Sequence, residues 1–136
     1  YLASSVEDLA PIAKSIINYA DRFPIILLIG EMGTGKTTLS KAIMLQLGVT
    51  ETSSPTFSLV NRYDTASGVW YHFDLYRIED EEELFDLGFE EYLDSGAPCL
   101  IEWPQIARPF IQAPFLKVSL ELEGEVRKIA LSTVST

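Results

Sequence analysis

The residues best suited to chemistry form one short stretch, Gly30-Glu31-Met32-Gly33-Thr34-Gly35-Lys36-Thr37, which matches the pattern G-x-x-x-x-G-K-[ST]. An apolar run precedes it and a helical pattern follows it, which is the context that a phosphate-binding loop requires. Glycines let backbone N–H groups converge on phosphate oxygens without Cβ clashes. The N-terminus of the following helix adds partial positive charge. The stretch therefore predicts a site for the phosphates of a nucleotide.

Three side chains at the end of this loop have distinct expected roles. Lys36 can reach the β- and γ-phosphate oxygens, the Thr37 hydroxyl suits Mg²⁺, and Thr38 can donate to the α-phosphate. The alternative is a chance glycine turn that merely caps a helix, which the flanking strand and helix disfavour. The sequence lacks the D-x-x-G and [NT]-K-x-D patterns that usually accompany guanine recognition. ATP is therefore favoured over GTP by default.

A phosphate-binding loop that uses Mg²⁺ needs a second, acidic contact for the metal, usually at the end of a neighbouring strand. Asp74 ends a strand-like run, and Glu102 follows a short buried run. Each could instead be a surface carboxylate or an arginine partner, and the sequence does not rank the two as metal contacts. His72 shares a strand face with Asp74 and is expected to be packed and hydrogen-bonded rather than a ligand. The acids of residues 79–84 suit a solvated helix face.

Two further residues carry weaker signals. Thr56 follows Ser54 and Pro55, between the loop helix and a predicted hairpin, where a hydroxyl can sense Mg²⁺ and the γ-phosphate. The same S-P-T tripeptide is also an ordinary turn before a strand. Trp103 suits the core and a stacking platform equally well. The single cysteine, Cys99, is expected to be a small core residue rather than a nucleophile.

Hydrophobic periodicity predicts the elements that must position these residues. A helix is expected within 4–20, with a capping box of Ser4 and Glu7 and with Pro11 kinking it or delaying its start. The other expected elements are a buried strand at 24–29, a helix at 36–47, a hairpin of 57–63 and 69–78, an acidic helix at 80–88, a buried strand at 98–103 and a terminal hairpin of 115–122 and 126–134. This order predicts an α/β fold with a mixed sheet and helices packed on it, in one domain over residues 1–136.

Composition restricts the class of protein. The 136 residues carry a net charge of −10, which opposes nucleic-acid binding by this chain alone and suits a partner with a basic surface. The sequence contains no apolar run long enough to cross a membrane and no recognisable secretory signal, so no membrane association and a cytoplasmic location are expected.

The motifs taken together resemble the TsaE family, formerly called YjeE. The segments GEMGTGKTT, SPTFSLV, YHFDLYRI, LGFEEYL and IEWP occur in that family's order and approximate spacing, from about Leu2 to Leu131. The loop is common to many families, whereas the combination of S-P-T-[FY], H-x-D-x-Y-R and E-W is more specific. The family comprises small bacterial ATPases required for threonylcarbamoyladenosine at position 37 of tRNAs that read codons beginning with A.

The resemblance implies a P-loop NTPase-like fold in which antiparallel strands flank the parallel core strands. It implies weak ATP hydrolysis with Mg²⁺, stimulated by the TsaB and TsaD proteins, with tRNA contacted only through that complex. By position, the resemblance assigns catalytic roles to Lys36, Asp74, Glu102 and Thr56. It assigns nucleotide contacts to Gly33, Thr34, Gly35, Lys36, Thr37, Thr38, Ala3 and Trp103. It assigns metal contacts to Thr37, Glu102 and Asp74.

Two other functions fit parts of the sequence. A small-molecule P-loop kinase would need a lid that brings arginines over the phosphates, and the ten basic residues show no arginine-rich segment. A nucleotide-sensing adaptor that binds ATP without meaningful turnover is hard to distinguish from a partner-activated ATPase by sequence.

Overall fold

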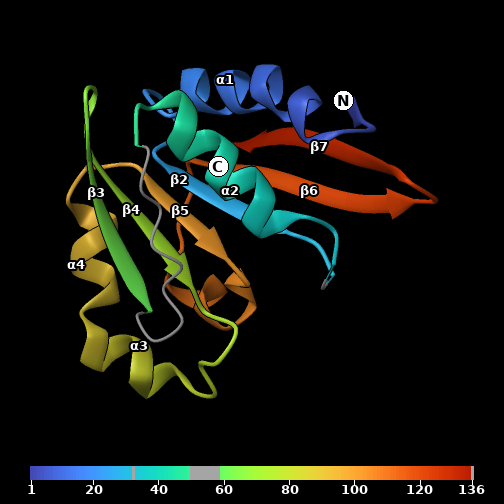
Figure 1. Cartoon of the computed structure of the whole chain (residues 1–136). Coiled ribbons are helices and arrows are strands. Elements are labelled where there is room, and N and C mark those ends of the chain that lie inside the picture. The colour runs from blue at the N-terminus through green and yellow to red at the C-terminus, as the bar shows by residue number, and fades with distance from the viewer. Residues whose placement is uncertain (32, 50–58, 136) are drawn as a thin grey trace.

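The protein is described by a computed structural model that covers residues 1–31, 33–49 and 59–135. Its strands form a single seven-stranded sheet in the order β1-β7-β6-β2-β5-β4-β3 (Figure 1). The strands are β1 (Leu2–Ala3), β2 (Ile25–Ile29), β3 (Val60–Thr65), β4 (Gly68–Asp74), β5 (Cys99–Glu102), β6 (Phe115–Glu123) and β7 (Val126–Val134).

Parallel pairing is confined to the middle of the sheet. Strand β2 runs parallel to both β5 and β6, and β4 runs parallel to β5. Strand β3 pairs antiparallel with β4 at one edge, while β7 and β1 continue antiparallel from β6 at the other. The predicted α/β fold, with parallel core strands flanked by antiparallel ones, is therefore confirmed.

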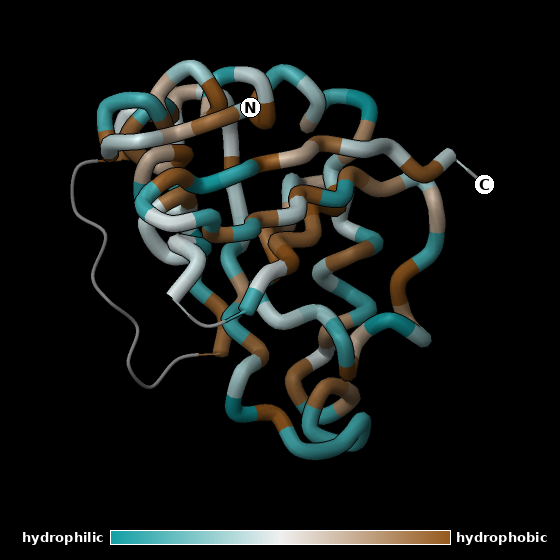
Figure 2. Tube along the Cα trace, turned by 90° about the vertical axis from the view of Figure 1, so that its right-hand side faces the viewer, coloured by the Kyte–Doolittle hydropathy of each residue, from teal (hydrophilic) through white to brown (hydrophobic). Residues whose placement is uncertain are grey.

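Helices cover both faces of this sheet. They are the 3₁₀ helix η1 (Val6–Asp8), α1 (Leu9–Tyr19), α2 (Lys36–Gln46), α3 (Glu81–Leu87), α4 (Phe89–Asp94) and the 3₁₀ helix η2 (Pro104–Phe110). Helices α1 and α2 pack on one face, where Ile26 and Leu28 of β2 join their core. Helices α3, α4 and η2 pack on the other face, which receives Leu27 of the same strand. Alternate side chains of β2 therefore join two separate cores, one on each face of the sheet. Figure 2 shows hydrophobic segments in the centre of the molecule.

Register brings the two predicted acids together. Asp74 lies opposite Glu102 across the β4–β5 pair, and Leu28 lies opposite Glu102 across β2–β5. The Leu75 N–H donates to the Glu102 carbonyl at 3.1 Å, which fixes this end of the two strands. Since carboxyl ends of parallel strands share one edge of the sheet, the phosphate-binding loop after β2 emerges beside both acids.

Several local predictions need correction. The acid that caps the N-terminal helical segment is Asp8, not Glu7: its carboxylate accepts from the Ser4 and Ser5 N–H groups at 2.9 and 3.2 Å. Helix α1 begins only at Leu9, so Pro11 falls in its first turn, where a missing N–H costs no helical hydrogen bond.

Other boundaries also differ. Strand β4 ends at Asp74 rather than 78, because the Asp74 carboxylate accepts the Tyr76 N–H at 3.1 Å and closes a turn. The short β1 and helix α4 were not predicted, since two residues and six residues are too short for a periodic signal. The beginning of the predicted strand at 57–63 lies partly outside the described residues. Within the described ranges, no helix has the length and apolar character needed to span a bilayer.

Cys99 is fully buried at the start of β5, as expected for a core residue. Burial raises the pKa of its thiol to about 12. The reactive thiolate is therefore disfavoured at neutral pH.

Replacing Ile101 by Ala should test how strongly the sheet that carries Glu102 depends on its core. Ile101 is fully buried in β5 between Leu27 and Phe73. The cavity left behind should lower the free energy of unfolding by about 2–5 kcal/mol. Urea denaturation would measure the loss. Leu122→Ala, at a half-exposed position of β6, is the control and should cost less than about 1 kcal/mol. Equal losses in the two variants would contradict this account.

Candidate functional site

The loop after β2 leaves the N-terminus of helix α2 open to an anion. Gly33 and Gly35 adopt left-handed backbone angles, with φ of 86° and 98°. Among the described residues, no side chain caps α2 at Gly35, which leaves the first-turn N–H groups available for an anion. A Cβ at Gly35 would also lie 2.6 Å from the Arg127 Nε. The backbone angle therefore favours glycine at this position, and a larger residue would also displace the Arg127 side chain.

Lys36 is 5% exposed although it is a lysine at the start of a helix. Its Nζ donates to the Gly30 carbonyl and, at 3.2 Å, to the Glu31 carbonyl. The same nitrogen lies 3.6 Å from the centre of the Trp103 ring. Desolvation by burial lowers the pKa of Lys36, and the charges of Glu102 and Asp74 oppose that shift. The ammonium is thus held by neutral groups, with no carboxylate in direct contact in the part of the chain that the structure describes.

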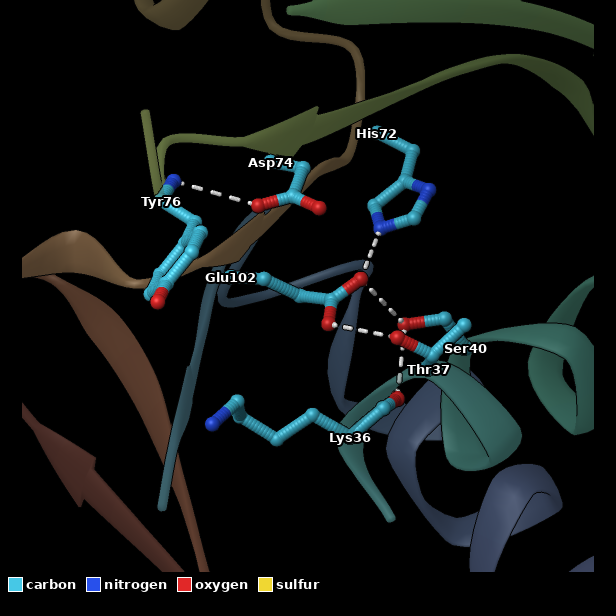
Figure 3. A network of polar contacts seen from close by, with 7 residues as sticks. All are labelled: Lys36, Thr37, Ser40, His72, Asp74, Tyr76 and Glu102. Atoms are coloured by element: carbon cyan, nitrogen blue, oxygen red, sulfur yellow. Dashed lines mark hydrogen bonds and ion pairs between the residues drawn. The ribbon is translucent and has the colours of Figure 1, made fainter. Parts of the chain in front are cut away.

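Glu102 is the most connected side chain of the site (Figure 3). Its Oε2 lies 2.5 Å from the His72 Nε2 and accepts from the Ser40 hydroxyl at 3.3 Å. Its Oε1 accepts from the Thr37 hydroxyl at 3.3 Å. Glu102 is only 2% exposed, and a buried carboxylate is stable only when its oxygens are hydrogen-bonded. The network therefore ties the end of β5 to the first turn of α2.

His72 has the role expected of it, a packed and hydrogen-bonded side chain. An ionised carboxylate can only accept, so Nε2 carries the proton of its hydrogen bond to Glu102. The imidazole reaches Glu102 from the neighbouring strand β4, two residues before Asp74. It therefore fixes Oε2 and leaves Oε1 facing Thr37.

A cavity of about 410 Å³ joins these groups. The residues that line it are Glu31, Gly33, Gly35, Lys36, Thr37, Thr38, Asp74, Tyr76, Glu102, Trp103 and Arg127. Trp103 adopts a left-handed backbone with φ of 57°, and its ring lies 4.9 Å from that of Tyr76. Trp103 therefore forms a wall of the cavity as well as a cover for Lys36.

The cavity gathers most of the residues that the sequence singled out. Two predicted nucleotide contacts lie just outside its lining. Thr34 is buried and donates its hydroxyl to the Glu31 carbonyl at 2.7 Å. Ala3 is fully buried in β1, opposite Arg127 of β7. Thr56 falls outside the described residues.

Sequence reasoning missed three contributors: Arg127, Ser40 and Tyr76. Arg127 donates from Nε to the Thr34 carbonyl at 3.2 Å, across 93 positions of sequence. Its only sequence signal is a basic pair beside the acidic turn of the last hairpin. Ser40 lies three positions after Thr37 in the same helix, so the i, i+3 spacing alone could have placed it beside Thr37.

The cavity offers oxygen ligands of the kind that Mg²⁺ prefers: the Thr37 hydroxyl and the Glu102 and Asp74 carboxylates line it together. No cluster of three or more His, Cys, Asp or Glu side chains occurs among the described residues. That composition fits Mg²⁺, which usually keeps several waters and takes one or two carboxylates together with substrate phosphates. Thr37, Glu102 and Asp74 would hold it.

The lowered pKa of Lys36 predicts a pH dependence of stability. Between that pKa and the unfolded value of 10.5, the unfolded chain binds more protons than the folded chain, so stability rises with pH. Urea unfolding of the wild type and Lys36→Met from about pH 8 to about pH 10.5 would measure it. The free energy of the wild type minus that of the variant should increase with pH. Lys41→Met, at an exposed position of the same helix, is the control. A flat or falling difference would show that Lys36 is not desolvated in the folded state.

Comparison with known proteins gives a consistent result. A family model described as threonylcarbamoyl adenosine biosynthesis protein TsaE matches residues 3–129. The tRNA threonylcarbamoyladenosine biosynthesis protein TsaE of Rickettsia felis is 35% identical over 94% of this chain and 75% of its own length. The protein of that name from Bacillus subtilis is 34% identical, over 94% and 81% respectively.

A solved structure gives the same answer for the fold. The crystal structure of YdiB from Bacillus subtilis superposes with a TM-score of 0.76 and 25% identity, covering 99% of this chain and 84% of that chain. Sequence relatives and structural neighbour thus agree on the family and the fold. The chain belongs to the TsaE family of threonylcarbamoyl adenosine biosynthesis proteins.

Proposed function

We propose that this chain, acting as one P-loop ATPase domain, binds and hydrolyses ATP with Mg²⁺. The reaction serves formation of the threonylcarbamoyl group on adenosine 37 of tRNAs that read codons beginning with A. The observation that carries the proposal is the bond between Thr37, on the loop helix, and Glu102, on the strand end beside Asp74. The relatives' names support the pathway. TsaB and TsaD are the proposed partners, and tRNA as the final target implies a cytoplasmic location.

The loop backbone and Lys36 would both bind the phosphates of the nucleotide. The open first turn of α2 and the glycine backbone would receive the phosphates. Lys36 would exchange the Gly30 and Glu31 carbonyls for phosphate oxygens, which compensate its buried charge better than neutral dipoles do. When bound, Mg²⁺ would neutralise charge on the β- and γ-phosphate oxygens.

Glu102 is the residue placed to orient the attacking water. Its Oε2 is occupied by His72 and Ser40, whereas its Oε1 contacts only Thr37 among the described residues. Thr37 would hold Mg²⁺ through its hydroxyl, and Oε1 of Glu102 would then be available. A carboxylate so held can align a water with the γ-phosphate without losing its own position.

Lys36→Ala should weaken ATP binding at least about a hundredfold, because it removes the charge-assisted contact to the phosphates. Isothermal titration with ATP and Mg²⁺ would measure the affinity, and phosphate release would measure turnover. Lys41→Ala, on the exposed side of α2, is the matched control and should bind like the wild type. An affinity for ATP that survives the loss of Lys36 would exclude this loop as the phosphate site.

Glu102→Gln should separate hydrolysis from binding. The variant keeps the size of the side chain but loses a carboxylate oxygen, so phosphate release should fall by about 10²–10⁴-fold. The affinity for ATP should change by less than about fivefold, because Lys36 and the loop remain. Glu121→Gln, exposed on β6, is the control.

The same assay, run with the TsaB–TsaD pair, separates the proposed ATPase from an adaptor. An adaptor would bind ATP and the pair, and release no phosphate above background. Stimulated release that also disappears in Glu102→Gln would support hydrolysis by this chain. ATP consumption that requires a small acceptor molecule would point instead to a kinase.

A further inference from the structure

The acidity of this chain is concentrated in one segment. Residues 79–94 contain nine of the twenty Asp and Glu residues and none of the ten Lys and Arg residues. The remainder holds eleven acids and ten bases, so nearly all of the net charge of −10 lies here. The segment forms helices α3 and α4, joined at Gly88 with φ of 77°. All nine carboxylates are exposed.

Local structure accounts for only some of these acids. Asp80 and Glu83 form a capping box: the Glu83 N–H donates to Asp80 at 3.2 Å, and the Glu79 and Asp80 N–H groups donate to Glu83 at 2.7 and 3.4 Å. Asp86 and Asp94 lie in the last turns of α3 and α4. Helix dipoles disfavour negative charge there. Their presence is not explained by helix stability.

A hollow lined by both apolar and acidic side chains lies within this face. A cavity of about 530 Å³ is lined by both helices and by Phe110 of η2. Phe85, in its lining, is 80% exposed, because the preceding residue Leu84 occupies the core-facing position of α3. Asp86, Glu90 and Glu91 line the same cavity. In Figure 2 this end of the molecule, at the bottom of the view, is mostly hydrophilic with isolated hydrophobic segments.

We infer that the α3–α4 face is a docking surface for a protein partner that places an apolar side chain in this cavity and Lys or Arg residues around it. Charge complementarity specifies the basic surroundings. The exposed phenyl ring and the cavity specify the apolar anchor. Nucleic acid is excluded as the occupant, because nine carboxylates repel its phosphates. The identity of the partner as the TsaB–TsaD pair rests on the proposed function.

This surface is separate from the nucleotide cavity but connected to both of its acids. The two cavities share no lining residue. Residues 75–80 lead directly from Asp74 at the end of β4 to α3, and η2 follows Trp103 directly after Glu102. Helix α3 packs against η2. A partner bound to α3 and Phe110 therefore contacts elements that are joined directly to the two segments that hold Asp74 and Glu102.

Two variants test the surface. Phe85→Ser removes the apolar anchor, and Asp86→Lys with Glu90→Lys reverses charge beside it. Leu122→Ser and Glu121→Lys with Glu125→Lys are matched controls, because they make the same changes at exposed positions of the last hairpin. Circular dichroism and ATP titration would confirm that each variant folds and keeps its nucleotide site.

The probe is the purified TsaB–TsaD pair from the same organism, with binding measured by surface plasmon resonance and phosphate release measured in parallel. Both α3 variants should bind the pair about tenfold or more weakly and lose stimulation, with ATP affinity unchanged. The controls should behave like the wild type. Wild-type affinity should fall as salt is raised.

The outcomes separate the two hypotheses. A wild-type chain that binds the pair, with both α3 variants binding equally well, overturns the docking surface and leaves the proposed function intact. A wild-type chain that neither binds nor is stimulated overturns the proposed function and this partner together. Loss of binding in the control variants as well would overturn the assignment to α3–α4.

Discussion

The site depends on one buried carboxylate. Glu102 ends β5 inside the protein, and three donors from two other elements satisfy it: His72 from β4, and Thr37 and Ser40 from α2. Removing a carboxylate from water costs several kcal/mol, so the fold is stable only if all three elements stay in register. The phosphate-binding helix is thereby fixed relative to the sheet edge, and the positions of Lys36, Asp74 and the loop follow from it.

Lys36 shows the opposite arrangement. Lys36 is nearly as buried as Glu102, but among the described residues its ammonium contacts two carbonyls and the face of Trp103 rather than a carboxylate. Direct pairing with either carboxylate would stabilise the apo protein and would also neutralise the charge that a phosphate needs. Separating the lysine from both acids keeps an anion site and a cation site within one small cavity. Burial lowers the pKa of Lys36, so the charged ammonium is less favourable in the folded state than in the unfolded chain.

The sequence was sufficient to predict those features that depend only on residues close together in the chain. The loop pattern, the continuous apolar strand before it and the alternation of β4 place Lys36, Thr37 and Asp74 correctly, because each follows from neighbouring residues. Glu102 was found because a buried run must end at a sheet edge. Arg127 was missed because only the pairing of β6 with β7 carries it to the loop. The link between His72 and Glu102 was missed for the same reason, since it depends on the pairing of β4 with β5, two strands that are far apart in the sequence.

The distribution of charge connects these observations to regulation. The phosphate-binding loop and the start of α2 carry the buried Lys36, while negative charge is concentrated on α3 and α4, which pack on the other face of the sheet from α2. A nucleotide and a basic protein surface would therefore approach different sides of the molecule without competing. Both would nevertheless act on the same two strand ends, because β4 and β5 carry Asp74 and Glu102 at their carboxyl ends and continue directly into the α3–η2 face. A sheet edge with a nucleotide on one side and a partner on the other is sufficient to make turnover depend on docking, without any additional moving domain.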